Sequence, residues 1–355
     1  MASTYLVLIN NVLRDLNEVE LTSATFSSSR GIQTSTKDFV NRAITDIINS
    51  ELNWPFTRAG GTLDLVSGKQ LYAYATVSST LKYLEYDTVF LQPKDYITNG
   101  DFEVSGSASV TGWTTVSGSP AASSKFGNTM KLTSAVATQA MSDLIVGKGY
   151  DVVVKLTGAT TTVTIGTSSG GSQTKSQTIT LSNANDSSYT TFSFTATAAT
   201  HYITFAEASG SNAYVGLVTV TQADINPQKL SFLTYEDWND KYRETDTSTD
   251  VNKIGEPDYV FTTYNDEIGF SPIPDSDNLS IKFDYYTTHT DLSSHDDTSI
   301  IPTRFEPVII ARARYYAFML RSDLQNAQFA NQEYQDGVKR MRVELINRKN
   351  YMRAV

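Results

Sequence analysis

Residues 289–297 hold the densest group of side chains that could do chemistry. His289 and His295 lie six positions apart, with Asp291 between them. Imidazole nitrogens and carboxylate oxygens bind divalent metals, so these three side chains could form a metal site. The same stretch is rich in Ser, Thr and Asp just before Pro302, where a polar connection between elements is expected. We favour the connection, because the spacing matches no common metal motif.

The chain lacks the residues on which most enzymatic mechanisms depend. The 355 residues include no cysteine and only three histidines, the third being His201. This excludes a cysteine nucleophile, thiolate metal sites and a disulfide scaffold. The sequence has no GxSxG elbow, P-loop, HExxH or dinucleotide fingerprint, and no pair of acids stands out for glycoside hydrolysis. We therefore expect a protein that is not an enzyme and has no catalytic cofactor.

Charge is distributed unevenly along the chain. The net charge is -10, yet residues 303–355 hold ten arginines and lysines against five acids, so residues 1–302 carry 18 bases against 33 acids, or -15. A basic end can dock to an acidic partner, or it can be an ordinary solvated helix face. The acidic remainder would repel DNA, because DNA binding needs bases that neutralise phosphates. No apolar run is long enough to span a membrane, and we find no signal peptide.

Four stretches at the two chain ends have the apolar spacing of helices. They are residues 4–17, a stretch that starts at Ser35 with Asp38 as a capping-box partner, and residues from about 304 to 324 and 326 to 348. We expect them to pack as one bundle, so that the chain starts and finishes in the same helical domain. The expected core residues are Tyr5, Leu8, Ile9, Val12, Leu13, Leu16, Phe39, Val40, Ala43, Ile44, Ile47, Ile48, Val308, Ile309, Tyr315, Tyr316, Met319, Leu320, Phe329, Tyr334, Val338, Met341 and Leu345.

Residues 101–225 differ in composition from both flanks. They include 42 serines and threonines in 125 positions and no arginine. Apolar and hydroxyl residues alternate in short runs bounded by Gly, Asn and Ser, which is the pattern of an all-β sandwich. A low-complexity linker and a repeat array are the alternatives; regular aromatic spacing argues against the first and the lack of a fixed period against the second.

The fold class that follows is α+β with nested domains. Residues 1–60 and 300–355 form the helical bundle. Residues 61–98 and 226–299 are strand-rich pieces, each too small for a stable sheet, so we expect them to close together into one small domain, a β-barrel or, as the alternative, a sandwich. Residues 99–225 are the inserted sandwich.

Short motifs in the flanking parts, taken in their order and spacing, carry a resemblance to a known family. They cover roughly residues 1–98 and 226–355 and are the helix from Leu8 to Glu18, Asn53-Trp-Pro-Phe, the strand from Gly68 to Tyr72, Gly255-Glu-Pro-Asp-Tyr, Pro272-Ile-Pro-Asp, Phe283-Asp-Tyr-Tyr, Ile301-Pro and Ala311-Arg-Ala-Arg-Tyr-Tyr-Ala. Together they resemble the head-to-tail adaptors of short-tailed bacteriophages, also called tail tubular or head-completion proteins. One departure is Tyr74-Ala75, where such proteins often have a proline.

The resemblance implies a structural protein in the neck or tail region of the virion. Such an adaptor attaches to the capsid portal, forms a twelve-fold ring with copies of itself around the DNA channel, and offers a surface to the downstream nozzle or tail tubular protein. Tail fibres are a further candidate partner, DNA would pass without specific binding, and no membrane contact is expected. We expect the last helix to face the portal, with Lys339, Arg340, Arg342, Arg348 and Lys349 as charged contacts and Met341, Leu345 and Ile346 as apolar anchors.

The insert has a resemblance of its own. Asn99-Gly-Asp-Phe-Glu, followed by Gly112-Trp113, is similar to the opening of carbohydrate-binding jelly-roll modules. This implies a jelly-roll fold and a structural calcium, for which Asp101, Glu103 and Asp224 would supply oxygen ligands. The alternative for these acids is ordinary hydrogen bonding at strand ends. Val215-Gly216 stands where the closing strand of such modules usually has an acid.

Aromatic side chains in the insert support an alternative function. A sugar site needs exposed aromatic faces beside a few planar polar groups. The candidate glycan contacts are Trp113, Tyr150, Tyr189 and Tyr202, with Tyr214 as a further aromatic residue. The chain would then be a glycan-binding adhesin or tail-fibre component that acts through the jelly-roll domain. A purely architectural insert explains the same residues.

Overall fold

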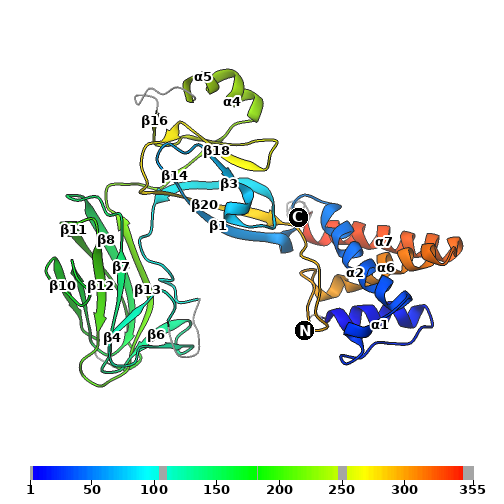
Figure 1. The fold of residues 1–355 in the computed structure, drawn as a ribbon, viewed down its shortest axis with the longest axis horizontal. Helices are drawn as coiled ribbons and strands as arrows, with labels where there is room; N and C mark the ends of the chain where they lie inside the picture. The colour runs from blue at the N-terminus through cyan, green and yellow to red at the C-terminus, as the bar shows by residue number, and fades with distance from the viewer. Residues whose placement is uncertain (1–2, 104–109, 182, 247–253, 347–355) are drawn as a thin grey trace, which may run out of the picture.

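The computed structural model describes residues 3–103, 110–181, 183–246 and 254–346. Figure 1 shows three bodies in a row, with helices at one end, two small sheets in the middle and a β-sandwich at the other end. Each body has its own cluster of buried apolar side chains. No helix in the described part of the chain is long and apolar enough to cross a membrane.

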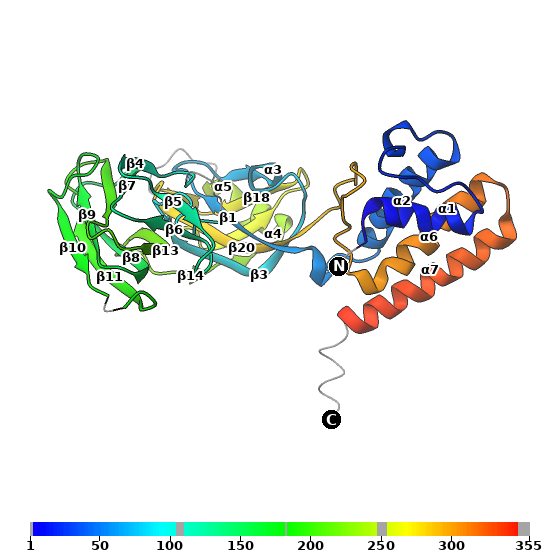
Figure 2. The same cartoon turned by 90° about the horizontal axis from the view of Figure 1, so that it is seen from below.

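Helices from the two ends of the chain pack together in the first body, as the sequence predicts. They are α1 (Tyr5–Asp15), α2 (Ile32–Asn49), α6 (Glu306–Leu320) and α7 (Leu324–Leu345), and Figure 2 shows them side by side. All four contribute to one buried cluster, in which Leu8, Ile44, Ile309 and Met341 are fully buried. A short 3₁₀ turn at Phe26–Ser28 lies between α1 and α2, and two more, at Pro55–Thr57 and Thr303–Phe305, lie where the chain leaves and re-enters the bundle.

Two details of the helix prediction are wrong. The second helix starts at Ile32 after Gly31, whose φ of +55° ends the preceding segment, and no side chain caps it. Ser35 therefore lies inside the helix, where its hydroxyl donates to the carbonyl of Gly31. Met319, Leu320 and Phe329 are exposed rather than buried. The α7 core stripe includes the predicted Val338 and Met341 together with Ala327 and Ala330, because helical spacing brings these positions onto one face.

The middle body has two four-stranded sheets on a shared core, so the predicted β-barrel is wrong and the alternative, a small sandwich built from both flanking pieces, describes it better. One sheet has the order β1-β20-β3-β14 and the other β15-β17-β18-β2. The chain passes between them at Leu230, and β14 and β15 on either side are only two residues long. Such short strands cannot carry a ladder around the corner, so the sheets stay separate. The bounds are β1 (Arg58–Asp64), β2 (Leu71–Ala73), β3 (Leu81–Pro93), β14 (Gln228–Lys229), β15 (Ser231–Phe232), β17 (Tyr259–Thr262), β18 (Glu267–Ser271) and β20 (Leu279–Thr287), with a further parallel pair β16 (Ile254–Gly255) and β19 (Ile273–Pro274) and helices α3 (Tyr74–Val77), α4 (Tyr235–Lys241) and α5 (Arg243–Asp246).

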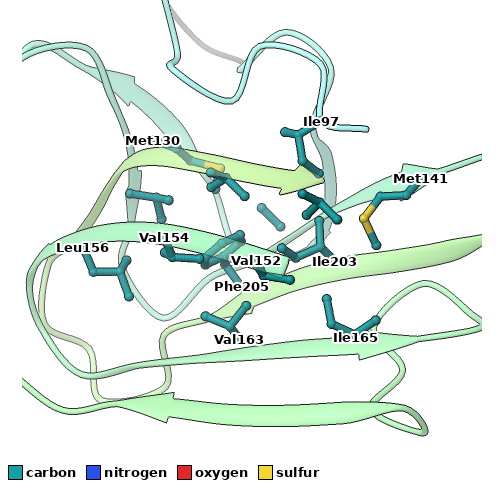
Figure 3. Close-up of a cluster of buried hydrophobic side chains, with 14 of the residues drawn as sticks. Ile97, Met130, Met141, Val152, Val154, Leu156, Val163, Ile165, Ile203 and Phe205 are labelled. Atoms are coloured by element: carbon teal, nitrogen blue, oxygen red, sulfur yellow. The ribbon is translucent and has the colours of Figure 1, made fainter. Parts of the chain in front are cut away.

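The third body is a sandwich of two five-stranded antiparallel sheets, which confirms the predicted all-β class of the insert. Their orders are β10-β9-β12-β7-β4 and β11-β8-β13-β6-β5. Figure 3 shows Val152 and Val154 from one sheet facing Ile203 and Phe205 from the other. The bounds are β4 (Thr114–Ser117), β5 (Ala121–Ser123), β6 (Thr129–Leu132), β7 (Val136–Met141), β8 (Gly149–Gly158), β9 (Thr161–Gly166), β10 (Lys175–Ile179), β11 (Ser187–Thr195), β12 (His201–Ala206) and β13 (Ala213–Gln222).

The chain enters and leaves the sandwich along adjacent paths. The N–H of Tyr96 donates to the carbonyl of Val220 at 2.9 Å, and the N–H of Val218 donates to the carbonyl of Gly100 at 2.8 Å. Gly100 is required at this crossing, because a Cβ there would lie 2.0 Å from the Val218 carbonyl oxygen. The sandwich is therefore joined to the middle body by two hydrogen-bonded segments.

Candidate partner interface

Helix α7 carries most of the side chains that the sequence assigned to a partner. It begins after Asp323, whose carboxylate accepts a hydrogen bond from the N–H of Asn326 at 3.2 Å and so caps the first turn. Its apolar stripe faces α6 and the bundle core, which leaves the charged face toward solvent. The apolar face of α7 therefore packs in the bundle, and its charged face is accessible to a partner.

The predicted portal contacts on α7 have different surroundings. Lys339 and Arg340 are exposed and pair with Asp336 at 3.2 Å and Glu344 at 2.7 Å on the same helix. Arg342 pairs with Glu51 at the end of α2. The half-buried apolar side chains, Leu345 and Ile346, pack against the bundle core, and Arg348 and Lys349 lie outside the described residues.

Met341 does not fit its predicted role as an apolar anchor for a partner. Its side chain is fully buried in the helical cluster. The reason is its place in the stripe, three residues after the buried Val338, on the face that meets α6. It stabilises the bundle and is not available at the surface.

Arginines of α6 hold the two chain ends together. Arg312 on α6 contacts Asp46 on α2 at 2.7 Å, and Arg314 contacts Asp15 of α1 at 3.2 Å. Burial opposes the charge of Arg312, but the hydrogen bond and charge of Asp46 outweigh it and raise its pKa. Much of the basic excess of the C-terminal segment is therefore neutralised inside the chain, which the composition could not show.

A groove of about 280 Å³ lies between α6 and α7. Its apolar side is formed by Phe305, Pro307, Val308 and Ala311. Gly337 completes the lining, and a Cβ there would lie 2.6 Å from a methyl carbon of Val308, so glycine permits the close approach of the two helices. Charged side chains complete the groove, namely Arg304, Arg314, Arg340 and Glu333.

A second surface lies at the turn that joins α6 to α7. Leu324 and Phe329 on α7 are 61% and 60% exposed, and Met319 and Leu320 at the end of α6 are also exposed. Sequence reasoning missed this surface because it counted Phe329 as core. The signal was present in the spacing: Ala327, Ala330, Tyr334, Val338, Met341 and Leu345 follow one another at intervals of three and four, and Phe329 does not.

The predicted glycan contacts do not gather on one surface. Tyr150 is fully buried on β8, where its hydroxyl accepts a hydrogen bond from the N–H of Ile145, so it is not available to a sugar. Trp113 packs against Phe102 and Phe205 at the edge of the core. Tyr189 on β11 is 65% exposed. Tyr202 is half-buried on β12, which belongs to the other sheet.

The predicted metal ligands are also kept apart or otherwise engaged. Asp224 pairs with Lys148 at 2.7 Å and accepts from the amide of Gln222. No group of three or more His, Asp or Glu side chains that could hold a metal occurs among the described residues. The sequence identified acidic residues near the strand ends but could not show which side chains they contact.

The histidine group of the connection likewise separates. His289 lies 3.9 Å from Asp291, whereas His295 faces Asp296 at 3.3 Å. Burial lowers the pKa of His289. The stretch is a polar connection between the middle body and α6, as favoured from sequence.

Comparison with known proteins decides the family. A family model described as SU10 adaptor protein matches residues 177–355, about half of the chain. The chain belongs to the SU10 adaptor protein family. This membership makes it a structural adaptor protein of phage and implies a location in the virion. The matched part of this adaptor includes α6, α7, the groove and the exposed turn.

No curated protein matches the sequence. Among solved structures, several match about a third of the chain at low identity. Tailspike protein 4 of bacteriophage CBA120 (enzymatically active domain) has 16% identity and a TM-score of 0.29, and the match covers 36% of this chain and 21% of that one. A family 16 carbohydrate-binding module has 16% identity over 36% of this chain and 99% of its own, with a TM-score of 0.29. A CBM4 module has 20% identity over 36% and 99%, with a TM-score of 0.26.

Proposed function

We propose that this adaptor joins the capsid portal to the tail in the neck of the virion, as a ring of twelve copies around the DNA channel. Its partners are the portal, the next tail component and neighbouring copies of itself. The observation that carries the proposal is the family membership, which rests on residues 177–355. The role is structural.

The surface of the helical body supports docking. Four exposed apolar side chains lie in the last turn of α6 and the first two turns of α7, and exposed apolar surface can mark a protein contact. The charged face of α7 lies beside the groove, with Lys339 and Arg340 toward solvent. Contacts of this kind can be weak singly, because a preassembled portal presents all of its docking sites together.

The acidic part of the chain supports the passage of DNA. Residues 1–302 carry a net charge of -15. A surface of this sign repels phosphates, so DNA that moves through a channel beside it would not stick. The basic C-terminal segment is left for protein contacts.

Copy number tests the proposal. This chain and the portal protein would be quantified in purified, salt-washed particles by mass spectrometry with labelled standards. One copy per portal subunit is the expected result. Loss on washing, or a multiple of three unrelated to the portal number, would show a peripheral fibre component instead.

A deletion of residues 338–355 would be too broad a test of the portal-facing element. That deletion would also remove Val338 and Met341 from the bundle core, so loss of attachment would not identify a contact. A truncation after Ile346 keeps both side chains and removes Arg348 and Lys349. We expect it to weaken attachment to the portal, and full attachment would assign the contact to residues before 347.

A further inference from the structure

The groove between α6 and α7 has the features of a site for a protein segment. Its lining combines an apolar side, formed by Phe305, Pro307, Val308 and Ala311, with three arginines and one carboxylate. The cavity volume of about 280 Å³ suits one large side chain rather than a whole ligand. The lining therefore favours a protein segment in which an apolar side chain lies next to a negatively charged one.

Two of the arginines already share a carboxylate at the rim. Glu344 contacts Arg340 through Oε1 at 2.7 Å and Arg304 through Oε2 at 3.7 Å. The two guanidinium groups come from different elements, since Arg304 precedes α6 and Arg340 lies on α7. Their side chains are 59% and 77% exposed. The rim is thus arranged to bind a carboxylate, and it presents two positive charges to one negative charge.

The intramolecular pairs at this rim are easy to exchange. Exposed ion pairs typically stabilise a protein by about 0–1 kcal/mol. An incoming carboxylate can therefore replace Glu344 at small cost. Deeper in the groove, Arg314 has its Nε buried without a hydrogen-bond partner in the described structure, although its terminal nitrogens contact Asp15 and Glu333.

We propose that this groove binds an acidic segment of the portal protein. An apolar side chain of that segment enters the groove, and a neighbouring carboxylate takes the place of Glu344 between Arg304 and Arg340. The inference rests on the proposed function, because the portal is the partner named there, and it adds the chemistry that recognises it.

A protein segment fits the groove better than DNA does. A phosphate backbone is bound by open basic surfaces with several unpaired lysines and arginines. Here the basic groups border an apolar groove, and carboxylates stand among them. Binding of DNA to the same arginines would overturn the proposal.

Charge reversal at the rim tests the inference. The full chain would be titrated against the immobilised portal ring at physiological salt. We expect R304E/R340E to bind at least about tenfold more weakly, because the variant replaces two charge-assisted contacts by repulsion. We expect E344Q to bind more tightly, because it removes the competing carboxylate. R304K/R340K keeps the charge without the guanidinium fork, so its affinity should fall between those of the unmodified chain and R304E/R340E.

A matched control keeps the test specific. R14E/R30E makes the same change in net charge at exposed positions of the helical body outside the groove. It should bind like the unmodified chain, and all variants should keep their thermal unfolding midpoint. Equal weakening by the control would reduce the effect to net charge and overturn the proposal.

The remaining outcomes separate this inference from the proposed function. If the unmodified chain binds the portal ring and R304E/R340E binds equally well, the groove is not the site, whereas the portal role stands. If the unmodified chain does not bind the ring, the proposed function fails and the inference fails with it. Retention of a double-stranded oligonucleotide that is lost in R304E/R340E but kept in R14E/R30E would assign the groove to DNA.

Discussion

The carboxylate of Asp95 accepts a hydrogen bond from the backbone N–H of Val220 at 3.0 Å, although 125 positions separate the two residues. The same oxygen, Oδ1, also accepts from the N–H of Ile97 at 3.0 Å. Asp95 therefore joins the segment that enters the sandwich to the strand that leaves it. It lies beside a cavity of about 460 Å³ at the junction with the middle body, which Asp64 and Asp101 also line.

Asp95 predicts a pH effect on stability. Burial, together with the nearby charges of Asp64 and Asp101, raises its pKa to about 6, above the ordinary value near 4. The folded chain thus holds this proton more tightly than the unfolded chain. The resulting stabilisation is present below about pH 4 and is lost as the pH rises through about 6.

The variant Asp95→Asn should therefore be more stable than the unmodified chain at pH 7.5, with the difference vanishing near pH 4. The amide oxygen can still accept both hydrogen bonds and carries no charge. The residue as a whole is exposed although its carboxylate oxygen is enclosed by backbone N–H groups, so solvent screens the effect and we expect a small gain, about 1–2 °C in the unfolding midpoint. Scanning calorimetry at several pH values measures it, and a loss of stability at pH 7.5 would contradict the assigned cause.

Excision of residues 100–225, with a short glycine linker between the cut ends, should leave a folded remainder. The entry and exit segments lie side by side, and the sandwich core is separate from the other two clusters. Circular dichroism and a cooperative thermal transition would check this. An insoluble product would refute the nested arrangement. The domain boundaries at residues 60, 98, 225 and 299 stay a prediction.

Asp46→Ala should destabilise the helical body by about 2 kcal/mol, since Asp46 bonds both Arg312 and Tyr316 across the interface of α2 and α6. Urea unfolding followed by far-UV circular dichroism measures the change. The matched variant is Glu20→Ala, whose exposed pair with Arg14 should contribute less than about 0.5 kcal/mol. Equal effects of the two variants would show that the Asp46 contacts do not hold the chain ends together.

The double variant Leu324→Ser and Phe329→Ser should lower attachment to the particle without lowering stability. Both side chains are largely exposed, so their removal should change the free energy of unfolding by less than about 0.5 kcal/mol. Leu52→Ser, at another exposed apolar position of the helical body, is the control and should leave attachment unchanged. Recovery of the double variant in purified particles at the normal copy number would exclude the turn as a contact surface.

Local periodicity was enough to predict the four long helices, but it missed the short helices α3, α4 and α5 in the strand-rich pieces. In α1 the spacing of Leu8, Ile9, Val12 and Leu13 identified the buried face correctly, because one face of a helix repeats every three to four residues whatever it packs against. Strand alternation likewise predicted the all-β class of the insert. Alternation separates two faces but does not say which one is inside, so Tyr150 and Tyr189 looked equivalent and only the structure shows one buried and the other exposed.

The sequence by itself determined the element types, the charge asymmetry, the absence of cysteine chemistry and the meeting of the two chain ends. The tertiary structure decided which charges pair, as in Arg312 with Asp46, 266 positions away, and which arginines meet around the groove. It also decided that the middle strands form two sheets and not a barrel. The physical reason is range: helix and strand patterns follow from neighbours along the chain, whereas ion pairs, grooves and sheet edges depend on groups that only folding brings together.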